Sequence, residues 1–132
     1  GKTIVTGSGD LFIKLWDAAT LTLKASVPYA HNNNILEVDL SPDGKTVVSC
    51  DDGSTGGDLK LWNAADLSLL FHKENAHSGY HGGSVKSVHF SPDSRTIATG
   101  GGEGRGDKRP RPYYYYGYYY DDAPDKHAIK LW

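Results

Sequence analysis

Short runs of alternating apolar and polar residues recur along this chain, separated by clusters of glycine, proline, aspartate and asparagine. Residues 35–40 (ILEVDL) show the alternation most clearly, and a two-residue period is typical of a β-strand with one buried face. The pattern predicts ten strands, at residues 3–6, 12–16, 21–27, 35–40, 46–49, 59–62, 67–72, 85–90, 96–99 and 128–132. No helical periodicity of useful length interrupts them, so we predict an all-β fold.

A four-residue phrase occurs three times, as IKLW at 13–16, LKLW at 59–62 and IKLW at 129–132. The tripeptide Ser-Pro-Asp precedes the second and third copies, at 41–43 and 91–93, and proline there predicts a turn because it presets φ. A repeated unit of this size cannot bury its apolar face alone, so neighbouring units must stack. Four-stranded sheets stacked radially form a β-propeller.

Two segments carry a family resemblance. VKSVHFSPD at 85–93 resembles the first strand and turn of the tryptophan–aspartate (WD) repeat, and IVTGSGDLFIKLWD at 4–17 resembles its second and third strands. The resemblance spans essentially the whole chain and implies a partial β-propeller of four-stranded antiparallel blades. Its expected parts are a partial blade at 1–27, a full blade core at 35–72, and a partial blade at 85–132 with an inserted loop at 100–127.

Ten strands amount to two and a half blades, which cannot close a ring. The chain also lacks methionine and opens on a GKT that matches residues 44–46 inside a repeat. We therefore expect it to be part of a longer polypeptide that supplies the rest of the propeller. Taken alone, it would expose sheet edges, and we predict that it aggregates or folds poorly.

The resemblance also implies a hydrogen-bonded tetrad in each blade. It joins a histidine before the first strand, a Ser or Thr on the second, an Asp in the next turn and the Trp of the third strand, which satisfies buried polar groups. Carried over by position, these residues are Thr6 or Ser8, Asp10 and Trp16; His31, Ser49, Asp52 and Trp62; and His81, Thr99 and Trp132. Their implied role is structural, not catalytic.

The spacing between the repeated tryptophans grows from 46 to 70 residues. Most of the excess is the inserted loop, and the connection at 74–84 is also long. In the family's topology both loops project from one face of the propeller, where binding function concentrates. The insertion carries basic and tyrosine-rich stretches, so we predict partner contacts from Lys108, Arg109, Arg111, Tyr113, Tyr114, Tyr115, Tyr116, Tyr118, Tyr119 and Tyr120. The alternatives are a low-complexity segment and tyrosines that fold back over their own blade.

Charge argues against nucleic acid as the partner. The formal net charge is −2 and acidic residues follow the tyrosines at 121, 122 and 125, so the electrostatic footprint of a nucleic-acid-binding protein is missing. An RGD tripeptide at 105–107 lacks the context that would make it an adhesion motif.

Candidate metal and catalytic groups do not form a recognisable site. His72, His77 and His81 lack a nearby cysteine or carboxylate to complete a zinc site, and Asp51, Asp52 and Asp58 do not have the spacing of a calcium loop and read as a solvated turn. Acidic neighbours should raise the pKa of Cys50, the single cysteine, and make it a poor nucleophile. We predict no catalytic residue, no cofactor and no metal.

The resemblance to WD-repeat proteins implies a non-enzymatic scaffold that mediates protein–protein interactions within a larger assembly. The alternatives are an RNA-associated propeller subunit and a propeller domain appended to an enzyme outside this segment. A lone cysteine, no recognisable signal peptide and no apolar run of membrane-spanning length favour a cytoplasmic protein without a membrane partner, and a nuclear or ciliary location remains an alternative.

Overall fold

The computed structural model describes residues 1–53, 56–78, 84–102 and 127–132. Within them the chain forms antiparallel strands and no helix, and therefore no helix that could cross a membrane. The strands are β1 (Thr3–Gly7), β2 (Ile13–Asp17), β3 (Leu23–Val27), β4 (Ile35–Leu40), β5 (Thr46–Asp51), β6 (Gly56–Asn63), β7 (Leu69–Ser78), β8 (Val85–Phe90), β9 (Ile97–Gly102) and β10 (His127–Leu131). The all-β prediction is confirmed.

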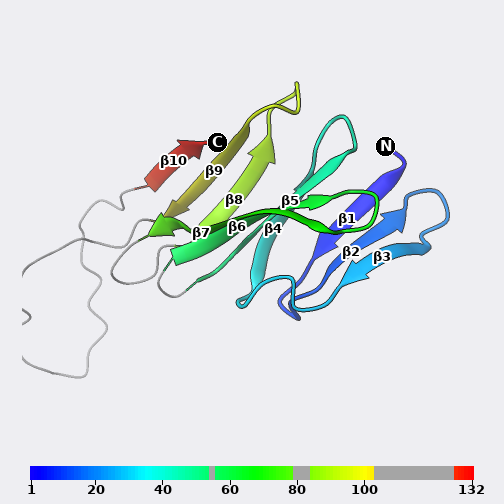
Figure 1. The fold of residues 1–132 in the computed structure, drawn as a ribbon, viewed down its shortest axis with the longest axis horizontal. Coiled ribbons are helices and arrows are strands. Elements are labelled where there is room, and N and C mark those ends of the chain that lie inside the picture. The colour runs from blue at the N-terminus through cyan, green and yellow to red at the C-terminus, as the bar shows by residue number, and fades with distance from the viewer. Residues whose placement is uncertain (54–55, 79–83, 103–126) are drawn as a thin grey trace, which may run out of the picture.

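The strands form three sheets that stand side by side (Figure 1). Their strand orders are β1-β2-β3, β4-β5-β6-β7 and β10-β9-β8. The repeated KLW phrase occupies the third strand of the middle sheet, β6, and lies on β2 and β10 in the others. By this correspondence the described part of the first sheet lacks an innermost strand and that of the third sheet lacks an outermost one.

Side chains from both faces of the middle sheet build two separate cores. On β5, Val47 belongs to the core shared with the first sheet, and Val48 belongs to the core shared with the third sheet. Ile13 and Leu15 of β2 fill the first core, while Val85 of β8 is in the second. Because strand side chains alternate between faces, stacking on both sides leaves Val47 and Val48 with no measurable exposure.

Two carboxylates also join the inner strands of the second and third sheets. Glu37 Oε2 accepts a hydrogen bond from the Val88 N–H at 2.7 Å, and Asp39 Oδ2 accepts one from the Phe90 N–H at 2.9 Å. In the third sheet, β9 pairs with one edge of β8. The two bonds satisfy backbone donors on the other edge of β8, where this sheet has no strand. They fix how the third sheet stands against the second.

No sheet among the described residues packs on the outer face of the first sheet. Leu21 and Leu67 occupy the same turn position, since their N–H groups bond the carbonyls of Asp17 and Asn63, respectively. Leu67 packs into the first core at 2% exposure, whereas Leu21 is 68% exposed. Among the described residues, the surface that covers Leu67 has no counterpart over Leu21.

Two strands, β7 and β9, run furthest past their predicted last residues. β7 continues from His72 to Ser78, where its last residues pair with Gly56 and Gly57, and β9 continues through Gly102, into what was predicted to be the inserted loop. The polar sequence of the first extension and the glycines of the second hide the alternation that marks a strand. The second blade therefore ends later than residue 72, and the insertion begins later than residue 100.

Candidate functional site

A buried chain of polar side chains ties the loop before β4 to the middle sheet. His31 Nε2 lies 2.6 Å from Ser49 Oγ, and the indole N–H of Trp62 donates to the same hydroxyl at 2.8 Å. His31 Nδ1 lies 3.1 Å from Asp51 Oδ2. None of the four side chains exceeds 5% exposure, so water does not compete with these contacts.

The donors and acceptors in this chain allow a single consistent direction for a neutral His31. The Trp62 indole can only donate, which leaves the Ser49 hydroxyl proton for His31 Nε2. Nδ1 then carries the proton on the side of the Asp51 carboxylate, although its geometry falls short of a hydrogen bond. Asp51 is held in turn by the Asp58 N–H, which donates to Oδ1 at 2.7 Å. Burial raises the pKa of the Asp51 carboxyl, but the contacts from His31 and Asp58 outweigh it and leave that pKa below its usual value.

The acid of this network is Asp51, and the prediction of Asp52 is wrong. β5 continues through Asp51, so the two-residue period of a strand places Asp51 on the same face as Ser49. Asp52 follows the strand, is exposed, and uses its N–H to bond the Asn34 carbonyl at 3.0 Å. The prediction that Asp51 belongs to a solvated turn is also wrong, because Asp51 is buried at the end of β5.

In the third sheet, Thr99 holds the hydroxyl position. Trp132 Nε1 donates to Thr99 Oγ1 at 3.0 Å, and His77 Nε2 lies 2.8 Å from the same oxygen. His81, the predicted histidine, lies outside the described residues. His77 was not predicted because the extension of β7 was not predicted, and Gly101 leaves room for its ring in the structure. A Cβ at Gly101 would lie 3.0 Å from the His77 ring and 2.2 Å from the Ser84 carbonyl oxygen.

In the first sheet, Thr6 and not Ser8 bonds the tryptophan. Trp16 Nε1 donates to Thr6 Oγ1 at 3.0 Å, and Ser8 Oγ accepts the Asp10 N–H instead. Asp10 Oδ1 accepts the Phe12 N–H at 3.2 Å. Asp10 therefore shapes the turn between β1 and β2, and its hydrogen bond with Ser8, followed by that from Phe12, lowers the pKa of its carboxyl.

The other candidate reactive groups are also engaged in structure. Burial, followed by smaller charge effects from Glu37 and Asp51, raises the pKa of the Cys50 thiol to about 12. His72 Nε2 lies 2.8 Å from Asp58 Oδ2. Within the described ranges, no three His, Cys, Asp or Glu side chains are grouped so that they could hold a metal ion.

The ends of β1, β3, β5, β7 and β9 lie at one end of the sheets, because every pairing is antiparallel and the strands follow in sequence. We call this end the loop face; its described connections are residues 8–12, 28–34 and 52–53. The opposite end carries short turns at 18–22, 41–45, 64–68 and 91–96. Both enlarged connections, 79–84 and 103–126, start from strand ends on the loop face. The predicted partner-binding residues between Lys108 and Tyr120 lie outside the described residues.

Comparison with known proteins identifies the fold. The family model described as "WD domain, G-beta repeat" matches residues 22–63 and 72–107, more than half of the chain. The chain belongs to the WD-repeat family. The first WD repeat match begins before β3 and ends with β6, so one repeat in sequence spans the outer strand of one blade and three strands of the next. This offset places His31 in the connection between two blades, and its network ties that connection to the middle sheet.

Several WD-repeat relatives match this chain over about three quarters of its length. "DDB1- and CUL4-associated factor 13" of Dictyostelium discoideum is 34% identical over 101 residues, covering 76% of this chain and 22% of that protein. "WD repeat-containing protein 82" of Drosophila melanogaster is 35% identical over 101 residues, covering 75% and 30%, respectively. "Small ribosomal subunit protein RACK1y" of Oryza sativa subsp. japonica is 30% identical over 91 residues, covering 69% and 24%. The chain thus spans less than a third of the length of each of these relatives.

Proposed function

We propose that this chain is part of a non-enzymatic WD-repeat scaffold that binds other proteins through its loop face. The observation that carries the proposal is that two enlarged connections start from neighbouring strand ends on that face. Beneath them lies a framework held by buried polar networks at Ser49 and Thr99. Loops carried by a rigid scaffold are where binding residues concentrate.

The relatives support an assembly role without naming a partner for this chain. Two of the three are named for an assembly or for other proteins, one as an associated factor and one as a ribosomal subunit protein. The buried networks support a structural role for the histidines and carboxylates, because groups closed off from solvent cannot meet a substrate. We propose that the tyrosine-rich stretch 113–120, with Lys108, Arg109 and Arg111, provides the main contact surface.

Quantitative co-purification from cells tests this function. The intact protein is compared with a variant lacking residues 105–122 and with one that carries serine in place of the seven tyrosines between 113 and 120. We expect both variants to lose co-purified proteins while their thermal unfolding stays unchanged. An unchanged set of co-purified proteins contradicts the proposal, and RNA that is released steeply by salt in their place supports the RNA-associated alternative.

A further inference from the structure

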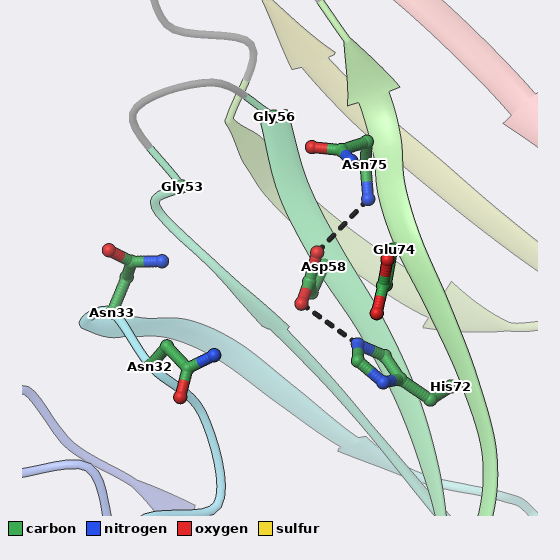
Figure 2. A pocket seen from close by; sticks show the side chains of 8 residues that line it. All are labelled: Asn32, Asn33, Gly53, Gly56, Asp58, His72, Glu74 and Asn75. Carbon is green, nitrogen blue, oxygen red and sulfur yellow. Dashed lines mark hydrogen bonds and ion pairs between the residues drawn. The ribbon is translucent and has the colours of Figure 1, made fainter.

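We propose that a pocket on the loop face receives a basic side chain, best fitted by arginine, from a protein partner; this rests on the proposed function and adds the chemistry of the contact. The pocket has a volume of about 240 Å³. Asn32 and Asn33 of the β3–β4 connection form one wall, and Asp58 of β6 faces them with His72 and Glu74 of β7 (Figure 2).

A bulge in the hairpin of β6 and β7 forms this pocket. Gly57 pairs with His77 and Leu59 pairs with Lys73, so the single residue Asp58 stands opposite three residues of β7. Those three include Glu74 and Asn75, which this bulge turns out of the regular ladder and into the pocket lining. Asn75 adopts a φ of 48°, a backbone conformation that asparagine tolerates better than most residues.

The pocket's central carboxylate is fixed in place. Asp58 Oδ1 accepts the Asn75 N–H at 3.0 Å, and Asp58 Oδ2 lies 2.8 Å from His72 Nε2 (Figure 2). The side chains of Asp58 and His72 are 18% and 29% exposed, so both still reach solvent through the pocket. Each carboxylate oxygen has a second lone pair that remains available to a ligand.

The charge of the lining selects a cation. Two carboxylates, Asp58 and Glu74, line the pocket, and the described residues of the lining include no lysine or arginine. Glu74 is exposed, and no ion pair joins it to another residue within the described part of the chain. A ligand with positive charge therefore gains two electrostatic partners without displacing a cation of the protein itself.

The volume of the pocket and the donor geometry of guanidinium indicate that the cation is a protein side chain. A pocket of about 240 Å³ is smaller than the roughly 300–1,000 Å³ typical of sites for drug-sized ligands. No arrangement of His, Cys, Asp or Glu suited to a metal ion occurs in the described residues. A guanidinium group offers five N–H donors in one plane, which can bond the carboxylates of Asp58 and Glu74 on one wall of the pocket.

The test uses three blocked pentapeptides that differ only at their central residue, which is arginine, lysine or citrulline between glycines. Citrulline keeps the shape of arginine and removes its charge. Their binding to the intact protein is followed by calorimetry and by backbone amide shifts of residues 32, 58 and 74. We expect the arginine peptide to bind most tightly, the lysine peptide more weakly, and the citrulline peptide at least about tenfold more weakly than arginine.

Two single variants separate the pocket from the general charge of the face. Glu74→Gln removes one charge from the pocket, and Asp52→Asn removes one from an exposed residue of the same face that does not line the pocket. We expect Glu74→Gln to weaken binding of the arginine peptide about tenfold or more, and Asp52→Asn to change it less than about twofold. Because both side chains are exposed, neither change should unfold the protein.

Equal binding of the citrulline and arginine peptides overturns the proposal, as does equal weakening by the two variants. Displacement of the arginine peptide by low millimolar Ca²⁺ also overturns it, because the pocket would then be a metal site. The experiments distinguish a failure of the pocket proposal from a failure of the proposed function. If the tyrosine substitutions remove co-purified proteins while no peptide binds, only the pocket proposal is lost.

Discussion

Removal of the Ser49 hydroxyl is the sharpest perturbation of the blade framework. Ser49→Ala deletes the group that binds both His31 Nε2 at 2.6 Å and Trp62 Nε1 at 2.8 Å. Ser49 is fully buried, His31 is 1% exposed and Trp62 is 5% exposed. Water therefore cannot easily replace the hydroxyl, and one donor and one acceptor lose their partner.

The size of the effect follows from those two orphaned groups. A buried polar group left without a partner costs about 1–3 kcal/mol, so with two such groups Ser49→Ala should lower the free energy of unfolding by about 2–6 kcal/mol. Ser68→Ala is the matched control, because the exposed Ser68 hydroxyl donates to Asp66 Oδ1 at 2.7 Å in a surface turn. Solvent can replace that bond, and the expected loss is below about 0.5 kcal/mol.

Urea unfolding of the intact protein, followed by tryptophan fluorescence, measures both losses. Hydrogen exchange of the Trp62 indole N–H adds a local readout, since only Ser49→Ala should accelerate it. Ser49→Thr should cost less than Ser49→Ala, because Thr99 shows that a threonine hydroxyl can make both contacts in the third blade. Equal losses for Ser49→Ala and Ser68→Ala would refute the reasoning.

Three further predictions address the acid, the thiol and a glycine. The folded-state pKa of Asp51 lies below its usual value, so its stabilising effect is complete above that usual value and is lost as the pH falls through the folded pKa. Asp51→Asn should therefore flatten stability against pH between pH 5 and 2 in urea titrations, and an unchanged slope would contradict this. Cys50, with its pKa raised to about 12 and no measurable exposure, should react with a thiol reagent only at the rate of unfolding, and fast labelling of the native protein would contradict this. Gly101→Ala would place a Cβ 2.2 Å from the Ser84 carbonyl oxygen and should lower the unfolding free energy by about 2 kcal/mol or more in urea, so an unchanged midpoint would show that the strand can shift.

Strand positions could be predicted from the sequence because one face of each strand packs on a neighbouring sheet. The alternation in ILEVDL and the repeated KLW phrase record that packing directly. The ends of β7 and β9 could not be predicted in this way. There, pairing depends on backbone contacts such as those of Gly56 with Ser78, and on space left by absent side chains, which residue hydrophobicity does not report.

The sequence was sufficient to predict that the blades hold hydrogen-bonded tetrads, but it identified only some of the residues that form them. Position within the repeat was sufficient for His31, Ser49, Trp62 and Thr99, because these lie on or beside regular strands. Asp51 could have been chosen over Asp52 by extending the two-residue period one step past Ser49. The pocket bulge was beyond sequence reasoning, because it depends on how β6 and β7 shift against each other between Gly57 and Leu59.

Hydrogen–deuterium exchange of the intact protein, alone and in the complex with which it co-purifies, tests the central claim most directly. The proposed scaffold role predicts slower exchange in the complex at the loop face, in residues 28–34, 52–58, 74–84 and 103–126. Exchange at the opposite turns, 18–22, 41–45 and 64–68, should stay the same. Protection confined to those opposite turns, with the loop face unchanged, would contradict the claim that this face carries the binding function.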